Sequence, residues 1–397
     1  MFLIRQSKAD DVGTLLKLAR MVYFINLPPD ERLIAAKIQH SRDCFLRIAT
    51  GAPLTLPEPG AHISGLASRD SDVFMFTLED TESGGVVGTS QIKAHMGGPG
   101  NPNYSFKLIR REFKSHSLGF GTHHLVARLN ADTSGPTEIG GLIIQPAFRG
   151  HKDHPGRLIS FVRFHFMALY RTTFADRIIA EMMAQVTSDG DNVFWDHIGR
   201  KFIPVKYAEA DRFCQHNRLF IDELLPKDDI YLTLLPLEVL NQVAQVGPET
   251  ASARRTLERL GFAFKDFVDP FDGGPHLEAA TDHVSLVKHT RRATIGEPLT
   301  AGKSTQHGIV SVLHSDGEFR AVETEFSVDK QGRVSVNEIA MRALNAEVGM
   351  PGGFTPFESR AKRKAPPRSS ERTVAAPISR PKAKAKAKRT HKAGNRA

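Results

Sequence analysis

The sequence has few cysteines and no long apolar run. Among its 397 residues are only two cysteines, Cys44 and Cys214. Two thiols in a chain of this length give neither a disulfide framework nor a metal-ligand spacing, which fits a reducing compartment. No segment approaches the roughly 18 apolar residues of a membrane helix, and the apolar start at Met1 runs directly into Arg5. We therefore expect a soluble cytoplasmic protein with no metal site and no membrane contact.

Positive charge is concentrated at the C-terminus. The segment 360–397 contains 14 Lys and Arg and one acid, Glu371, so it contributes +13 to a net charge of +9 and leaves −4 for the rest. Large apolar side chains are scarce there, so we expect a disordered basic tail over residues 353–397. Such a tail attracts polyanions without sequence preference. Because no recognition helix accompanies it, we expect nucleic acid to bind only non-specifically, through the tail.

Helical and strand patterns alternate in the rest of the chain. Phe2–Arg5 predicts a strand, a helix follows from Ser7 or Asp10, and a second amphipathic helix is predicted over Asp30–Ile48. Thr50–Asp70, rich in Pro, Gly and Ser, predicts a loop. These patterns indicate an α/β (α+β) fold in which helices flank a mixed sheet. Further strands are predicted over Val73–Leu78, Val86–Lys93, Tyr104–Phe113, His123–Leu129, Glu138–Ile144, Arg177–Met182 and Ile203–Tyr207.

One strand, turn and helix form a candidate anion site. The strand Glu138–Ile144 leads through the turn Arg149–Arg157 into a helix that starts at Pro155 and Gly156. Free N–H groups and the helix dipole favour phosphate at such a helix start, and coenzyme A carries a pyrophosphate. The alternative is an ordinary crossover in which the glycines only permit packing.

The order of elements resembles the GCN5-related N-acyltransferase fold. In that fold two central strands splay apart where the turn begins, and the pantetheine arm of the cofactor lies in the opening. A short helix over Asn192–Phe202, with a glycine at Gly199, precedes a predicted strand, and Ala251–Phe264 repeats this order of helix, glycine, phenylalanine and strand. A duplicated half-fold and a coincidence both remain open as explanations.

Several motifs resemble arginine N-succinyltransferases, in the same order and spacing. The likeness extends over about residues 1–287, weakens over 288–350 and ends before the tail. The most specific motifs are the Phe-Trp-x-x-x-Gly segment and the Phe-Asp-Gly-Gly-Pro run. The matching residues are Glu181–Met182, Phe194–Trp195, Gly199, Phe202, Glu223–Lys227, Ile230–Tyr231, Gly261–Phe262, Asp269–Pro275 and Leu277–Glu278.

This resemblance implies transfer of a succinyl group from succinyl-CoA to the α-amino group of arginine, the first step of an arginine-degrading route. It places a succinyl-CoA contact at Leu142, where strand backbone can hydrogen-bond the pantetheine amides. Succinyl-CoA, or another acyl-CoA, would be a cosubstrate, and no permanently bound cofactor is expected. With the turn, the expected acyl-CoA contacts are Leu142, Ile143, Ile144, Arg149, Gly150, Gly156 and Arg157.

The chain also departs from the family pattern. Gly247 stands where the family has its catalytic histidine between Val and Pro, so that proton donor is missing. Val22–Pro28 replaces a glycine run near the expected acceptor region. The phosphate turn is longer, and only Arg149 and Gly156 clearly match while Gly150 is displaced. Both the catalysis and the preference for arginine are therefore open.

His276 is the candidate replacement, because the family has no histidine at this position in its Asp-Gly-Gly-Pro-x-Leu-Glu pattern. His197 and Tyr231 are further candidates, and each of the three is more often structural than catalytic. Two other readings remain: a diverged subunit beside a homologous partner or in a homo-oligomer, and an acyltransferase for another amine. The expected organisation is an acyltransferase-like domain (1–207), a second half (208–295), a small β-rich segment (296–352) and the tail (353–397).

Overall fold

The computed structural model describes residues 1–21, 27–52, 71–187, 190–214, 218–300 and 304–357. The chain divides into two compact units, Met1–Arg363 and Lys364–Ala397, and only the first contains described residues. The predicted tail from residue 358 onward, nearly all of the predicted Thr50–Asp70 loop and most of the Val22–Pro28 departure lie outside them.

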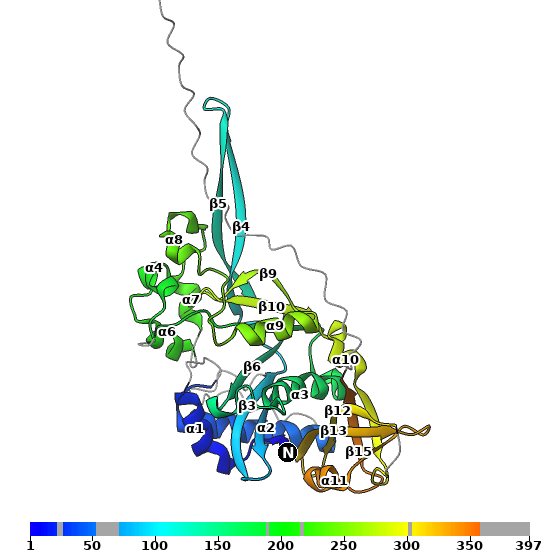
Figure 1. The fold of residues 1–397 in the computed structure, drawn as a ribbon. Helices are drawn as coiled ribbons and strands as arrows, with labels where there is room; N and C mark the ends of the chain where they lie inside the picture. The colour runs from blue at the N-terminus through cyan, green and yellow to red at the C-terminus, as the bar shows by residue number, and fades with distance from the viewer. Residues whose placement is uncertain (22–26, 53–70, 188–189, 215–217, 301–303, 358–397) are drawn as a thin grey trace, which may run out of the picture. The chain divides into compact units, whose positions relative to one another are not determined.

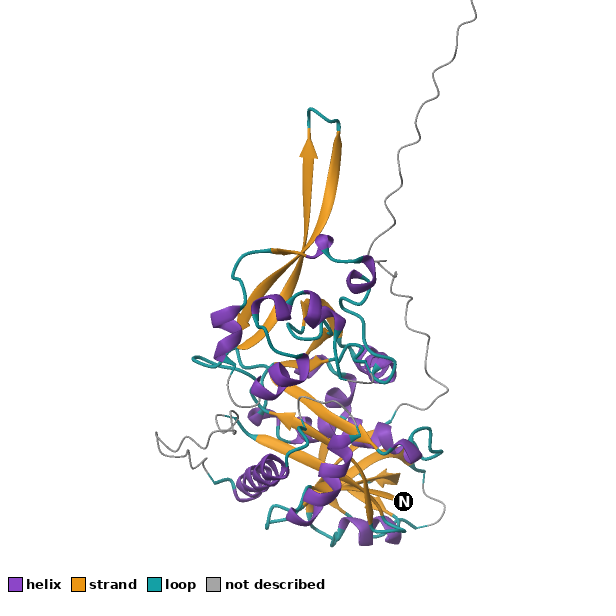
Figure 2. Ribbon diagram, turned by 90° about the vertical axis from the view of Figure 1, so that its left-hand side faces the viewer, coloured by secondary structure: helices purple, strands orange, loops and turns teal. Residues whose placement is uncertain are grey.

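A single mixed sheet of 15 strands runs through the described chain, so the predicted fold class is confirmed (Figures 1 and 2). Its strand order is β12-β15-β11-β14-β13-β1-β2-β3-β6-β7-β10-β9-β4-β5-β8. The strands are β1 (Phe2–Gln6), β2 (Val73–Asp80), β3 (Gly85–Lys93), β4 (Asn103–Ser115), β5 (Phe120–Asp132), β6 (Thr137–Ile144), β7 (Arg177–Glu181), β8 (Ile230–Tyr231), β9 (Ala263–Val268), β10 (Pro275–Ala280), β11 (Arg291–Ile295), β12 (Gln306–Leu313), β13 (Phe319–Val328), β14 (Arg333–Val336) and β15 (Pro351–Pro356).

Helices cover this sheet, and the predicted early helices are confirmed. Asp30 caps the second helix, since its carboxylate accepts a hydrogen bond from the N–H of Leu33 at 3.0 Å. No helix of the described segments combines the length and apolar composition needed to cross a membrane. The helices are α1 (Val12–Arg20), α2 (Glu31–Thr50), α3 (Pro155–Leu169), α4 (Val193–His197), α5 (Gly199–Phe202), α6 (Tyr207–Cys214), α7 (Leu219–Leu224), α8 (Leu237–Leu240), α9 (Ala251–Leu260), α10 (Ser285–His289) and α11 (Glu338–Leu344).

Phenylalanine dominates the main core. The sequence contains 25 phenylalanines, and Phe45 of α2 meets Phe74 and Phe76 of β2 and Phe166 of α3 with ring centroids 5.1 to 5.5 Å apart. Edge-to-face pairs at this spacing stabilise beyond their buried area, by about 0.5–1.5 kcal/mol each. The cluster fixes α3, and therefore the turn before it, against the sheet.

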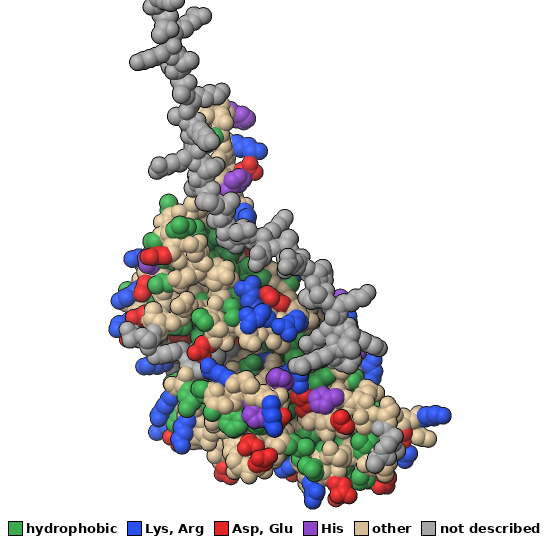
Figure 3. All heavy atoms as spheres, viewed as in Figure 1, with side chains coloured by type: hydrophobic (Ala, Val, Ile, Leu, Met, Phe, Trp, Pro, Cys, Tyr) green, Lys and Arg blue, Asp and Glu red, His purple; other side chains and the backbone are tan. Residues whose placement is uncertain are grey.

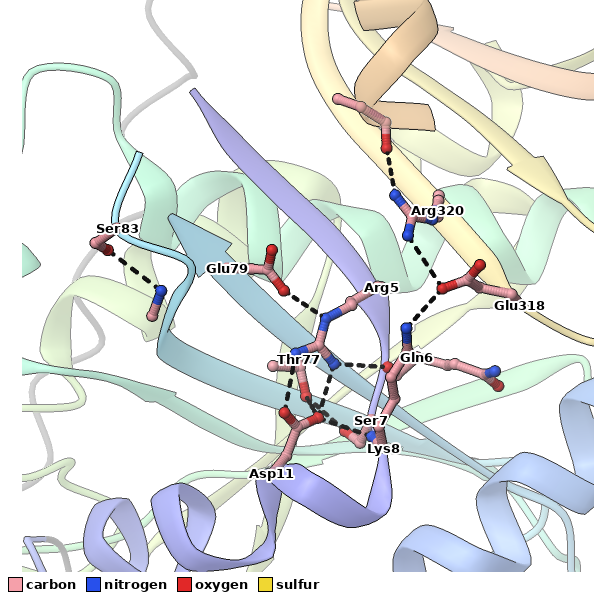
Figure 4. Close-up of polar contacts among 12 residues, drawn as sticks. Arg5, Gln6, Ser7, Lys8, Asp11, Thr77, Glu79, Ser83, Glu318 and Arg320 are labelled. Atoms are coloured by element: carbon pink, nitrogen blue, oxygen red, sulfur yellow. Dashed lines mark hydrogen bonds and ion pairs between the residues drawn. The ribbon is translucent and has the colours of Figure 1, made fainter. Parts of the chain in front are cut away.

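Buried ion pairs tie β1 to its neighbours (Figure 4). The Arg5 guanidinium donates to both carboxylate oxygens of Asp11, at 2.7 and 2.9 Å, and to Glu79 at 2.7 Å. Just after β1, the partly exposed Lys8 donates to Glu318, the residue directly before β13, at 2.8 Å. The strand β1 and the residues that follow it therefore hold the start of α1, the strand β2 and the C-terminal strands together.

The last five strands close on themselves. In addition to the pairings of the linear strand order, β12 pairs with β13 along its whole length. This pairing completes a ring of β12, β15, β11, β14 and β13. The strands of the predicted β-rich segment thus belong to a small barrel, which also includes β11 from the predicted second half, and the division of the chain into domains stays a prediction. One boundary was wrong: Gly353–Pro356, placed in the tail, belong to β15, where Thr355 is fully buried.

A long hairpin formed by β4 and β5 projects from the rest (Figures 1 and 2). Its register continues to Ser115 opposite Phe120, beyond the predicted strand ends. Lys, Arg and His side chains lie along it in Figure 3, and Phe113, Leu118 and Phe120 are exposed near its tip. The hairpin is longer than predicted because the two strands stay paired beyond the segments in which apolar and polar residues alternate.

The predicted strand Ile203–Tyr207 was wrong. Pro204 has no N–H for a ladder, the Val205 carbonyl accepts a hydrogen bond from the Trp195 indole at 3.0 Å, and Tyr207 begins α6. Only Ala251–Phe264 of the two similar segments therefore leads into a strand, β9. A duplication of the half-fold stays a prediction.

Candidate functional site

Two neighbouring strands diverge in the middle of the sheet. The parallel strands β6 and β7 share two register pairs, Thr137 with Ile178 and Glu138 with Ile179. β6 continues beside β3 as far as Ile144, whereas β7 continues beside β10. The sheet therefore opens between the second half of β6 and the end of β7, as the resemblance predicts.

A bulge in β6 lies at the opening. Thr89 and Gln91 of β3 face Ile143 and Gly140, so two residues of β6, Gly141 and Leu142, lie opposite the single residue Ser90. Gly141 has φ +57°, a conformation that glycine adopts without steric cost. Because β7 has already turned away, this edge of the β6 backbone faces the opening.

The three acyl-CoA contacts predicted on β6 differ in their burial and in the core cluster that they join. Ile143 is buried in the cluster that joins α1, α2 and β2, while Leu142 and Ile144 are half-buried and pack against the main core. A ligand in the opening would therefore meet the β6 backbone rather than three aliphatic side chains. A strand edge of this kind can hydrogen-bond amide groups.

The turn after β6 ends at the start of α3. Gly150 is left-handed at φ +76°, and His154 precedes Pro155 with φ +49°. The N–H of Gly156 belongs to the first helical turn, which has no intrahelical carbonyl partner for it. A β-carbon on Gly156 would lie 3.7 Å from Cγ1 of Ile144, so this helix start adjoins the end of β6.

Two arginines of the turn have different partners. Arg149 Nη1 lies 3.3 Å from Glu249 Oε2, and both side chains are largely exposed. The Arg157 guanidinium instead pairs with Glu323 of β13 and lies over the ring of Phe357. Of the two, only Arg149 faces the segment that contains Gly247.

Gly247 lies at the end of β7. Its N–H donates to the carbonyl of Met183 at 3.1 Å, and the Thr250 hydroxyl donates to the same carbonyl at 3.0 Å. The position where the family has its histidine is therefore just beyond the strand that borders the opening. The Arg149–Glu249 pair connects this segment to the turn before α3.

A polar pocket begins where β7 ends. In it, Asn103 Nδ2 donates to Glu181 Oε1 at 2.8 Å, and Arg218 Nη1 donates to Asn103 Oδ1 at 3.0 Å. Carboxylate, amide and guanidinium groups thus share one concave surface with apolar walls. The pocket is lined by Asn103, Tyr104, Glu181, Cys214, Arg218, Ile221, Asp269, Pro270 and Phe271.

His276 lies behind this pocket. It is 7% exposed, and it faces Glu181 in the β10–β7 register. Its Nε2 is 4.0 Å from Glu181 Oε1 and 4.0 Å from Asp269 Oδ2, and it has no hydrogen-bond partner within the described chain. Burial acts to lower the pKa of His276, but these carboxylates outweigh it and raise the pKa above its usual value.

The family motifs build the turn that holds Asp269. The Asp272 carboxylate accepts from the N–H groups of Gly274 at 2.7 Å and Ala184 at 2.8 Å, which ties the turn to the end of β7. The ring of Trp195 stacks on Phe271 with centroids 5.1 Å apart. The two most specific motifs of the sequence therefore pack together and position the pocket wall.

The other two candidate residues lie elsewhere. His197 Nδ1 is 2.8 Å from the carbonyl of Val193 in its own helix, and Tyr231 is on β8, the last strand of the sheet order. Neither lines the pocket. Sequence reasoning missed Asn103 and Arg218 and gave Glu181 no role, although an acid directly after the apolar run of β7 is a usable signal.

Comparison with known proteins gives consistent results. The family model described as arginine N-succinyltransferase beta subunit matches residues 2–286. The arginine N-succinyltransferases of Escherichia coli O17:K52:H18 (strain UMN026) and Shigella dysenteriae serotype 1 are each 30% identical over 300 residues, 75% of this chain and 81% of theirs. A solved structure, arginine/ornithine succinyltransferase subunit AI from Pseudomonas aeruginosa, matches with a TM-score of 0.73 and 26% identity over 90% of this chain and 99% of that one.

Proposed function

The chain belongs to the arginine N-succinyltransferase family, and we propose that it transfers the succinyl group of succinyl-CoA to the α-amino group of arginine. It is an N-acyltransferase with an acyl-CoA cosubstrate; the succinyl group and the arginine acceptor are the proposed parts. The observation that carries the proposal is the opening between β6 and β7, with a bulge on one side and a helix start at its end.

The opening supports a specific placement of the cosubstrate. The exposed backbone edge at Leu142 can hydrogen-bond the amides of a pantetheine arm, and the N–H of Gly156 can donate to the pyrophosphate. Arg149 adds a positive charge at the rim. Arg157 contributes less in this arrangement, because Glu323 already neutralises it.

Acyl transfer also needs a group that takes a proton from the amine. Gly247 cannot do this, so the proposed proton acceptor is His276, which lies behind the polar pocket, 4.0 Å from Glu181 and Asp269. General acid-base help is worth roughly 10² to 10⁴-fold, whereas positioning two reactants can contribute about 7–11 kcal/mol. The missing histidine therefore lowers the rate without removing the basis of catalysis.

A turnover screen tests this function. Purified chain would be incubated with succinyl-CoA or acetyl-CoA and a panel of amino acids, with products followed by mass spectrometry. The proposal predicts that succinyl-CoA with arginine gives the highest turnover number. A higher turnover with another amine would identify that amine as the acceptor in place of arginine. A higher turnover with acetyl-CoA would identify acetyl, in place of succinyl, as the transferred group.

One observation favours a second function. Gly247 removes the family's histidine from the segment that borders the opening, as expected of a diverged subunit that supports a competent homologue. The matching Pseudomonas aeruginosa structure is itself described as a subunit. Co-purification with a homologue that keeps Val-His-Pro at this position, without turnover by the isolated chain, would support this alternative.

A further inference from the structure

The hairpin of β4 and β5 continues past the strands beside it. β4 pairs with β9 at Phe106 and Lys107, and β5 pairs with β8 at Val126 and Ala127. Between these positions and the turn, residues 108–125 form a two-stranded ribbon that has no third strand among the described residues (Figures 1 and 2). A two-stranded hairpin is marginally stable in water, and open strand edges invite pairing with another chain. The ribbon is therefore a candidate interaction surface.

Large apolar side chains are exposed at the tip of the ribbon. Phe113, Leu118 and Phe120, which we call the tip patch, are between 47% and 68% exposed. The ring of Phe113 contacts His124 with centroids 5.5 Å apart, and His124 contacts Tyr231 of β8 at 5.8 Å. One face of the ribbon is therefore aromatic from near its tip to β8. Apolar side chains that gather on a surface in this way mark a site of protein contact.

A second apolar patch lies at the base of the ribbon. The Thr233 hydroxyl accepts a hydrogen bond from the N–H of Leu125 at 3.0 Å, which attaches the segment after β8 to β5. The next residue, Leu234, is 86% exposed, and Leu237 at the start of α8 is 67% exposed. We call these two leucines the base patch. Leu125 is five strand residues from Phe120, so the base patch begins roughly 17 Å from the tip along the ribbon.

The two ends of this surface carry opposite charge. The ribbon contains three Lys and Arg and one acid, a net charge of +2, whereas the segment 226–240 around the base patch contains one Lys and three acids, a net charge of −2. The ion pair of Arg111 with Asp229 removes one charge from each and leaves the signs unchanged. A polyanion that follows the ribbon would be repelled at the base patch. A second copy of the chain, turned end for end, meets the opposite charge at both ends.

We propose that two copies of this chain associate through their ribbons, antiparallel about a two-fold axis, with the tip patch of each packed on the base patch of the other. A two-fold contact uses the same surface on both copies, so one patch of each kind per chain is sufficient. If the five apolar side chains of each copy lose on the order of 100 Å² apiece, the contact covers about 1,000 Å², the size that a specific interface needs. The inference concerns assembly and does not depend on the acyl group or its acceptor.

Sedimentation velocity of the purified full chain, at concentrations up to ~100 µM, should show a monomer–dimer equilibrium. Phe120→Glu in the tip patch and Leu234→Glu in the base patch should each raise the dissociation constant at least 10-fold, because each places a charge in an apolar contact. Ile339→Glu is the matched control, since Ile339 of α11 is 59% exposed and belongs to neither patch. It should leave the dissociation constant unchanged, and circular dichroism should show all three variants folded.

Cross-linking tests the reciprocal arrangement. Leu118→Cys and Leu237→Cys chains, mixed and treated with a short bis-maleimide, should form a covalent dimer of one chain of each kind, and each variant alone should form far less. The native Cys44 and Cys214 are buried, so the native chain is the unreactive control.

Three results would overturn the proposal: a monomeric native chain, a dimer that neither Phe120→Glu nor Leu234→Glu weakens, or equal cross-linking in the mixture and in the separate variants. Heparin binding by a monomeric native chain, lost in Phe120→Glu, would assign the ribbon to a polyanion instead.

Discussion

The backbone N–H of Gly247 donates to the carbonyl of Met183, 3.1 Å away, and Met183 is the second residue after the end of β7. A β-carbon at this position would lie 3.1 Å from the carbonyl oxygen of Ala184, tight enough to require a shift of a few tenths of an ångström. Any side chain at this position therefore requires a small shift of the backbone at Ala184. Two residues further along the chain, Glu249 pairs with Arg149 of the turn before α3.

Gly247→His should raise succinyl transfer to arginine, by up to roughly 10² to 10⁴-fold, because it restores a general acid-base group at the mouth of the opening. Steady-state kinetics of the two chains measure this. Gly247→Ala is the control, because it adds the same β-carbon without an imidazole. Equal rates for the His and Ala variants would contradict a proton-transfer role at this position.

His276 should give acceptor binding a pH dependence. The carboxyl groups of Glu181, Asp269 and Asp272 face it and raise its pKa. Below that pKa the imidazolium repels the acceptor's ammonium, and above it the neutral Nε2 accepts a hydrogen bond. The KM for arginine should therefore fall as the pH rises through the pKa of His276, and kcat should rise if His276 takes the proton.

His276→Gln should remove this pH dependence and lower kcat, while Glu278→Gln, a change on β10 at a residue that pairs with Arg177, should keep the native profile. The comparison uses full pH profiles of kcat and KM for the three chains. An identical profile in His276→Gln would assign the titration to another group, and an unchanged kcat would limit His276 to a structural role.

Gly156→Val should weaken acyl-CoA binding and leave the fold intact. The first carbon of a side chain there makes an ordinary 3.7 Å contact with Ile144, whereas the β-branch crowds the approach to the helix start. Calorimetry with CoA should show at least a 10-fold loss of affinity at an unchanged melting temperature. Gly156→Ala is the control and should lose less. Unchanged affinity in the Val variant would contradict this placement of the pyrophosphate.

Removal of residues 360–397 should leave folding and turnover unchanged. This segment lies outside the described residues, so the prediction rests on its composition, which offers little apolar area to bury. Thermal unfolding should give the same midpoint, and adsorption to a polyanion resin at low salt should decrease because the truncated chain is net acidic. A large drop in the midpoint would show that the tail contributes to the folded unit.

Local patterns predicted most of the regular structure. Short runs rich in strand-forming residues, joined by a glycine-containing turn, identified β2 and β3 and the hairpin between them, and the apolar period of α3 was confirmed together with its start at Pro155. The same reasoning was wrong for Ile203–Tyr207, because alternating burial is also produced by a chain that wraps around Trp195. Burial patterns show which side chains face inward, and they do not show which backbone groups are paired.

The polar pocket could not be predicted in the same way. Asn103 and Glu181 are 78 positions apart in the sequence and are brought together by the order of the strands. His276 was selected as a departure from a family motif, but its carboxylate partners follow from the β10–β7 register. Register across a sheet of this size depends on every intervening strand, which no single segment encodes.

The most direct test of the central claim is a product analysis of the purified native chain with succinyl-CoA and L-arginine. Tandem mass spectrometry locates the added succinyl group, and thiol titration measures the CoA released. The account predicts one Nα-succinylarginine for each CoA, at a rate that falls in His276→Gln and stays unchanged in Glu278→Gln. Release of CoA without an acylated product, or no reaction above the uncatalysed rate, would contradict it.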